Sequence, residues 1–210
     1  MSLQMMIAWI GLLYILVFCG MSIFRREKVS IRFVVESICI TAITYVLVAY
    51  TPLQIHSAIF LLFLYGFTLR ARLLVDLANF FARNGKNKLA DKIYQLASHL
   101  WPDKTSKTII NVNRAIFLVQ DNRLDESIVM FTQLLNPEDK KYLSARFEAA
   151  VHYNLGVAYL RKDDHSVAEI EFNTVVETWP NSPYAERSQQ ALDRMHSNAK
   201  WSIDDSLVRK

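Results

Sequence analysis

Apolar residues dominate the first third of the chain, and a mixed pattern of apolar and charged positions follows. Residues 3–24 carry no charged side chain, and this run ends at Arg25 and Arg26. At about 1.5 Å rise per residue, a helix of this length covers about 33 Å, enough for a hydrocarbon core of about 30 Å. We therefore expect a first transmembrane helix here.

Two shorter apolar runs follow the first. Residues 33–50 are interrupted only by Glu36, and Thr51-Pro52 then ends the helical pattern because proline removes a backbone donor. Residues 53–69 form the third run, which stops at Arg70. We expect these two runs to form a tight transmembrane hairpin, which brings the predicted number of transmembrane helices to three.

Basic residues flank the apolar runs unevenly. The loop after the first run carries Arg25, Arg26, Lys28 and Arg32, and Arg70 and Arg72 follow the third run, whereas residues 50–56 contain no lysine or arginine. Cytoplasmic loops are the ones enriched in these residues. This pattern predicts an external N-terminus and an internal C-terminal domain, which in a bacterium means the inner membrane and the cytoplasm.

Glu36 is an ionisable group inside a predicted membrane helix, where such groups are rare and often functional. It lies four residues after Arg32, a spacing that allows an ion pair along a helix. A proton or ion pathway is the alternative, but three helices with one boundary carboxylate are poorly suited to transport. We favour the interfacial ion pair.

Helical patterns with a common spacing recur three times after residue 70. Each contains a small residue, an aromatic residue four positions later and a closing proline, with a second small residue twelve positions upstream. Small side chains at a helix crossing let two backbones approach closely. The three sets are Ala78, Ala90, Tyr94 and Pro102; Ala115, Ser127, Phe131 and Pro137; and Gly156, Ala168, Phe172 and Pro180.

This arrangement resembles the tetratricopeptide repeat, a helix–turn–helix unit of about 34 residues. The resemblance covers about residues 71–182 and is clearest in the third unit, whereas Arg114 replaces the expected leucine in the second. It implies an all-α chain with three transmembrane helices and then a solenoid of about three helix pairs. Gly85 falls in the first turn between paired helices, where we expect a positive φ.

A further helix is predicted to cover the last repeat. Ser182-Pro183 is typical of a helix N-terminus, and Ala185, Ser188, Leu192 and Met195 recur at helical spacing behind it. Terminal repeats need such a cap. We therefore divide the chain into a membrane domain (1–70), a repeat domain (71–199) with this capping helix, and a frayed C-terminal tail (200–210).

The resemblance also implies a protein-binding groove lined by the first helix of each pair. Asparagines there can hold a peptide backbone through paired hydrogen bonds, and arginines can bind carboxylates. An equal alternative is that the asparagines only satisfy their helical neighbours. A clamp for a C-terminal carboxylate, as in chaperone-binding members, is doubtful because Val75 and Ala150 replace the expected lysines. The predicted groove residues are Val75, Asn79, Arg83, Val112, Asn113, Ile116, Gln120, Tyr153, Asn154, Val157 and Arg161.

No proline or glycine interrupts residues 67–83, so we expect the third membrane helix to continue directly into the first repeat helix. A helix over residues 53–83 would be about 46 Å long. It would hold the repeat domain against the bilayer and favours a partner that is itself membrane-associated.

Other classes of function find little support. The formal net charge is +4, but both signs are interspersed after residue 70, so nucleic-acid binding is not expected. The two cysteines lie in apolar runs and give no disulfide framework. We recognise no catalytic, metal or cofactor motif and expect no small-molecule substrate. The sequence favours a membrane-anchored scaffold, adaptor or assembly factor that binds another protein. The alternative is a structural or accessory subunit of a membrane complex or transport system.

Overall fold

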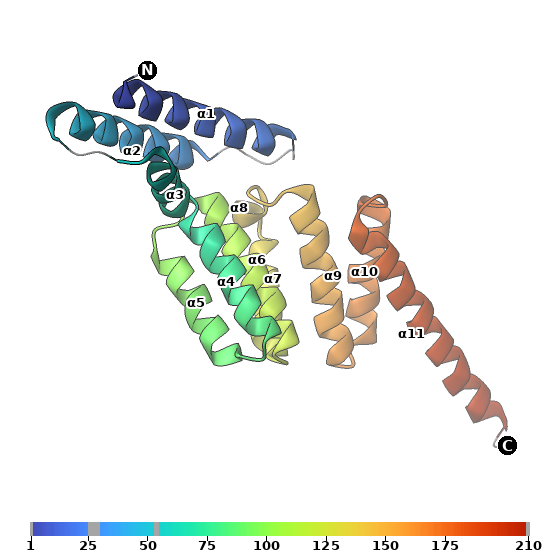
Figure 1. The fold of residues 1–210 in the computed structure, drawn as a ribbon. Coiled ribbons are helices and arrows are strands. Elements are labelled where there is room, and N and C mark those ends of the chain that lie inside the picture. Colours follow the sequence, from blue (N-terminus) through green and yellow to red (C-terminus); the bar gives the residue numbers. More distant parts are fainter. Residues whose placement is uncertain (1, 25–29, 53–54, 209–210) are drawn as a thin grey trace. The chain divides into compact units, whose positions relative to one another are not determined.

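The computed structural model describes residues 2–24, 30–52 and 55–208. All regular structure in these ranges is helical, as predicted (Figure 1). The chain divides into two compact units, residues 1–110 and 111–210, with the division inside α6 (Lys104–Gln120). Each unit is described by itself.

Among the described residues, α1 (Leu3–Phe24) and α2 (Ile31–Tyr50) are individually long and apolar enough to cross a membrane. The Ser30 side chain caps α2 by accepting a hydrogen bond from the backbone N–H of Phe33 at 3.3 Å. The two helices pack together, and a Cβ placed on Gly11 would come within 3.0 Å of the Thr41 side chain. Glycine therefore permits this close contact. The length and apolar composition of both helices confirm them as candidate membrane spans.

The third predicted span differs from expectation. α3 (Ser57–Thr68) and α4 (Arg70–Arg83) are bent by 77°, so the predicted continuous helix over residues 53–83 is wrong. Leu53, the expected start of that helix, lies outside the described residues. With 12 residues, α3 covers only about 18 Å. The bent pair as a whole meets the length and composition of a span, so the chain has two candidate spans, or three if this pair is one.

Side-chain hydrogen bonds explain the bend at Leu69. The Thr68 hydroxyl donates to the carbonyl of Leu64 at 2.7 Å, a bond that tends to bend helices. The Arg70 guanidinium donates to the carbonyl of Phe67 at 2.8 Å. In a continuous helix that carbonyl would accept from the backbone N–H four residues later. Side chains thus satisfy the helix end without a proline or glycine.

α5 (Asn87–His99) packs along α4 as an antiparallel hairpin (Figure 1). Ala78 of α4 and Ala90, Tyr94 and Ala97 of α5 are all fully buried. α5 ends before Trp101-Pro102, as the proline predicted.

The second unit contains the rest of α6 together with α7 (Leu124–Leu134), α8 (Pro137–Lys140), α9 (Ala145–Arg161), α10 (His165–Thr178) and α11 (Pro183–Val208). α9 packs on α7 and α10, and α10 packs on α11 (Figure 1). Phe131 lies in the buried cluster with residues of α6 and α9, and Phe172 lies in a second cluster with Leu192.

α11 begins at Pro183, where we predicted the capping helix. The Ser182 hydroxyl accepts a hydrogen bond from the backbone N–H of Ala185 at 3.2 Å. Ala185, Ser188 and Leu192 are buried as expected. The helix runs to Val208, beyond residue 199 where we placed the end of the repeat domain.

Three turns share one hydrogen-bonding pattern. Gly85, Asn122 and Asp163 have φ of 71°, 61° and 61°. The N–H of each bonds to the carbonyl three residues before it, and the next N–H bonds to a carbonyl five residues before itself. This is the Schellman motif, which ends a helix on a left-handed residue. The prediction of a positive φ at Gly85 is confirmed, and the other two turns repeat it.

The buried positions repeat in the same register as the turns. Each left-handed residue lies five positions before a buried small residue and nine before a buried aromatic residue. The first helix of each pair buries a small residue at the matching place. The positions are Ala78, Ala90 and Tyr94; Ala115, Ser127 and Phe131; and Gly156, Ala168 and Phe172. Three segments of the chain therefore form the same kind of hairpin.

Candidate functional site

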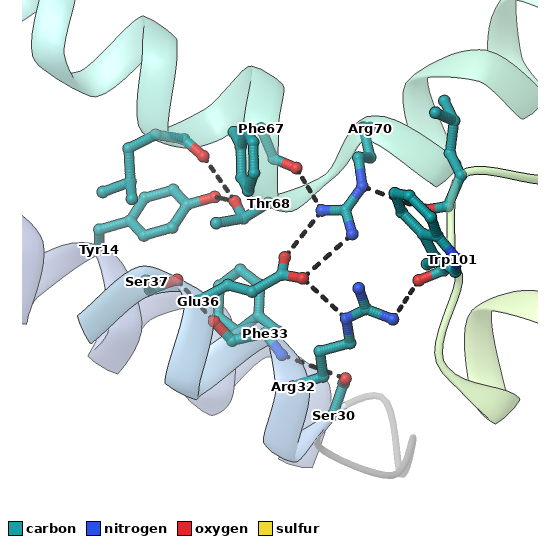
Figure 2. A network of polar contacts seen from close by, with 12 residues as sticks. Tyr14, Ser30, Arg32, Phe33, Glu36, Ser37, Phe67, Thr68, Arg70 and Trp101 are labelled. Atoms are coloured by element: carbon teal, nitrogen blue, oxygen red, sulfur yellow. Dashed lines mark hydrogen bonds and ion pairs between the residues drawn. The ribbon is translucent and has the colours of Figure 1, made fainter. Parts of the chain in front are cut away.

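A cluster of charged side chains lies at the start of α2, centred on Glu36 (Figure 2). Arg70 reaches it with two nitrogen atoms, which donate to the carboxylate oxygens at 2.7 and 3.0 Å. Arg32 donates through Nε to the same carboxylate at 2.7 Å. The side chains of Glu36 and Arg70 are only 19% and 22% exposed. Two cations around one half-buried anion leave the cluster with a net positive charge.

The two arginines also hold the chain segment that follows α5. Arg32 donates to the backbone carbonyl of Trp101, and Arg70 donates through Nε to that of Leu100 at 3.4 Å (Figure 2). Trp101 has φ of 45°, an unusual conformation for a bulky residue. The arginines therefore join α2, the start of α4 and the end of α5 through a single set of bonds.

A second polar contact lies near the end of α3. Tyr14 of α1 and Thr68 share a hydrogen bond of 2.7 Å between their hydroxyls (Figure 2). The Tyr14 ring lies 4.7 Å from the ring of Phe18 and 5.6 Å from that of Phe33, measured between centroids. The C-terminal end of α3 is thereby fixed beside α1 and the start of α2.

A pocket of about 120 Å³ opens beside the charged cluster. Phe18 and Phe33 contribute apolar surface to it, while Arg32 and Arg70 contribute donors. The rest of the wall comes from the ends of α1 and α3, the starts of α2 and α4, and residues between 101 and 110. Its shape therefore depends on the ion pairs that Glu36 makes.

The sequence predicted part of this cluster. The ion pair between Arg32 and Glu36 is confirmed. Arg70 was assigned only to the membrane boundary, and its contact with Glu36 was missed. A half-buried carboxylate such as Glu36 needs more than one hydrogen-bond donor. The sequence paired it with Arg32 alone, and this shortage of donors was the available signal for a further partner.

The groove residues predicted on α4 have three different environments. Val75 is 4% exposed, so its side chain is not open to a ligand. Asn79 accepts a hydrogen bond at Oδ1 from the hydroxyl of Tyr94 at 2.6 Å. Arg83 is exposed near the end of the helix. The asparagine thus satisfies a neighbour within its own hairpin, which is one of the two alternatives for it.

On α6, Val112 is fully buried, Asn113 and Ile116 are half-buried and Gln120 is exposed. Asn113 takes part in an interaction with other residues of the chain. Ile116 packs against the cluster that contains Phe131. Gln120 is therefore the most accessible of the four.

On α9, the four predicted groove residues contact parts of the second unit. Tyr153 packs on Phe172 and Tyr184, with ring centroids 5.9 and 5.5 Å apart. Asn154 donates to the carbonyl of Ala150 at 2.7 Å. Val157 packs against both apolar clusters, and Arg161 donates to the carbonyl of Val119 at 2.7 Å. The groove as a binding surface stays a prediction.

Comparison with known proteins adds no assignment. No protein-family model, no curated protein sequence and no solved structure matches this chain. The functional argument therefore depends on the geometry of the chain itself.

Proposed function

We propose that this chain is a membrane-anchored adaptor of the tetratricopeptide-repeat type, which binds another protein through the first helices of its hairpins. The observation that carries the proposal is the threefold recurrence of one hairpin, with the same left-handed turn and the same buried positions. Stacked hairpins of this kind build extended surfaces whose usual role is protein binding. The length and apolar composition of α1 and α2 support membrane anchoring.

Contacts near Glu36 support a three-span topology with the repeats in the cytoplasm. Arg70, which follows α3, bonds to Glu36 near the start of α2. The segment that follows α3 therefore lies beside the N-terminal end of α2. This is the end of α2 that comes directly after the basic loop. Arg25, Arg26 and Lys28 of that loop lie outside the described residues, and positive loops are cytoplasmic. We infer on this basis that the repeats lie in the cytoplasm, which in a bacterium means the inner membrane.

Affinity purification in mild detergent, followed by mass spectrometry, tests the adaptor proposal. The intact protein is compared with an Asn113→Ala/Asn154→Ala variant. A matched control carries Lys92→Ala and Glu177→Ala, two exposed positions on second helices of the hairpins. Circular dichroism establishes that both variants are folded.

A partner retained by the control and lost from the asparagine variant supports binding through the groove. A partner that both variants retain in a stoichiometric complex refutes groove binding. That result would favour the alternative, a structural or accessory subunit held by its membrane helices.

A further inference from the structure

We propose that α4 lies in the interface of the lipid bilayer, with an apolar stripe directed toward the acyl chains. The stripe consists of Leu73, Leu77 and Phe80, which are spaced four and three residues apart and so share one helix face. Their exposed fractions are 36%, 43% and 60%.

Comparison with α9 shows what this face does in another hairpin. When Ala78 is matched to Gly156, the stripe corresponds to Val151, Leu155 and Ala158. These three residues are 0%, 4% and 0% exposed, in a cluster with Phe131 and Leu134 of α7. This face of a first helix is therefore the one that packs against the second helix of the preceding hairpin.

Two of the three matching positions on α6 are buried as well, and the third, which matches Leu77, is the half-buried Arg114. Ile110 and Phe117 correspond to Leu73 and Phe80, and they are 1% and 2% exposed. In the described part of the chain, no hairpin of this kind precedes α4, and the side chains of the stripe are exposed. Among the described residues, α4 is thus the first helix whose matching face has all three positions exposed.

Continuity with the membrane helices identifies lipid as the occupant. Leu69 alone separates α3 from α4. α3 exposes large apolar side chains, with Leu62 at 71% and Phe63 at 58%. If α3 lies along the bilayer normal and ends beside the start of α2, where Arg70 bonds to Glu36, the 77° bend turns α4 close to the membrane plane.

The charges of α4 fit an interfacial position. Three arginines and one aspartate, Asp76, are its charged residues, so the helix is net positive. At about 100° per residue, Arg72, Asp76 and Arg83 fall on one edge of the stripe. Arg70, on the other edge, is held by Glu36. Arg83 is exposed near the end of the helix, where its stem can lie along apolar surface while its guanidinium group reaches the headgroups. The net positive charge of the helix favours anionic phospholipids.

This inference depends on the membrane anchoring in the proposed function, and it restricts the protein-binding groove to the later hairpins. If α4 lies at the interface, the first hairpin is part of the anchor. The surfaces left for a partner then belong to the later hairpins.

Nitroxide accessibility in the full-length protein tests the proposal. Cys19 and Cys39 are replaced by alanine, and single labels are introduced by Leu77→Cys or Phe80→Cys. The controls are Val129→Cys and Ile170→Cys, whose native side chains are exposed to a similar extent, 56% and 62%. The protein is reconstituted in vesicles of phosphatidylcholine and phosphatidylglycerol. Collision rates are measured with oxygen, which concentrates in lipid, and with a water-soluble nickel chelate present on both sides.

We expect the ratio of oxygen to chelate collisions to be several-fold higher at the stripe than at the controls. Equal ratios at all four sites would place the stripe in water and overturn the proposal. Low collision rates with both reagents would also overturn it, because they indicate cover by protein. Spectral broadening that disappears on dilution with unlabelled protein would identify that cover as a second copy. Loss of partner capture in the purification experiment tests the proposed function, whereas the collision rates test the position of α4. Failure of one proposal can therefore be told apart from failure of the other.

Discussion

The hydroxyl of Tyr94 donates a 2.6 Å hydrogen bond to the side-chain oxygen of Asn79, which joins the two helices of the first hairpin. At the matching positions the second hairpin has Phe131 and Ile116, and the third has Phe172 and Val157. A polar pair in one hairpin thus replaces an apolar pair in the other two. This exchange explains why an asparagine occupies a position that is otherwise aliphatic.

Tyr94→Phe is expected to lower the free energy of unfolding by about 1 kcal/mol, because the half-buried Asn79 oxygen loses its donor. Thermal melting of both proteins at neutral pH, followed by circular dichroism, measures the difference. Unchanged melting would show that water replaces the donor without cost.

The same variant has a distinct pH dependence. Burial, and secondarily the Asp76 carboxylate, raise the pKa of Tyr94 above its ordinary value of 10.0. The folded state therefore prefers the neutral phenol. This preference is fully present below about pH 10 and is lost as the pH rises toward the folded-state pKa. The stability difference between wild type and Tyr94→Phe should shrink above about pH 10, and a constant difference would contradict this account.

Removal of Arg70 should cost more stability than removal of Arg32. Arg70 makes two hydrogen bonds to Glu36 and is 22% exposed, whereas Arg32 makes one and is 40% exposed. We expect a loss of about 1–3 kcal/mol for Arg70→Gln and under about 1 kcal/mol for Arg32→Gln. Melting in detergent tests the ranking. The reverse order would show that the bond from Arg32 to Trp101 dominates.

Gly85→Ala is expected to destabilise the protein by about 1–2 kcal/mol, because an alanine at φ of 71° is strained. An added Cβ would meet no atom within 4 Å, so the cost is conformational. Gly66→Ala, at a helical glycine with the same free space, is the control and should be neutral or stabilising. Gly85→Asn should be milder than Gly85→Ala, since Asn122 occupies the matching turn. Equal melting of the two Gly85 variants would contradict the argument.

Gly156→Ala tests packing instead of backbone strain. A Cβ at Gly156 would lie 2.8 Å from the Phe172 ring, which is fully buried and has little room to move. We expect a loss of about 1–3 kcal/mol from this overpacking, against no loss for Gly66→Ala. Melting in detergent compares them. If Gly156→Ala melts like wild type, the third hairpin tolerates a wider helix separation than the structure has.

Sequence patterns predicted the helical content and the ends of several helices well. X-Pro pairs marked the ends of α5 and α10, and Ser182-Pro183 marked the start of α11, because proline acts locally on the backbone. The ion pair between Arg32 and Glu36 was equally local, four residues apart on one helix. Signals of this kind need no knowledge of tertiary structure.

Features that depend on distant residues were not predictable in the same way. The bend at Leu69 involves the hydroxyl of Thr68 and the bonds of Arg70, and Arg70 is held by Glu36, 34 positions earlier. The left-handed conformation of Asn122 and Asp163 was nevertheless predictable. Each residue lies five positions before a small buried residue, as Gly85 does. For the groove, burial of Val75 and Val112 follows from tertiary packing that periodicity alone does not determine.

The single-residue connection at Leu69 has a consequence for encounter rates. A binding domain on a long flexible linker samples a large volume, whereas the first hairpin of the proposed adaptor, joined to the proposed membrane anchor through one residue, would stay within a thin layer along the bilayer. A partner that also resides in the membrane would meet it by diffusion in two dimensions, at an effective concentration set by the membrane area. A partner from solution would gain no such advantage.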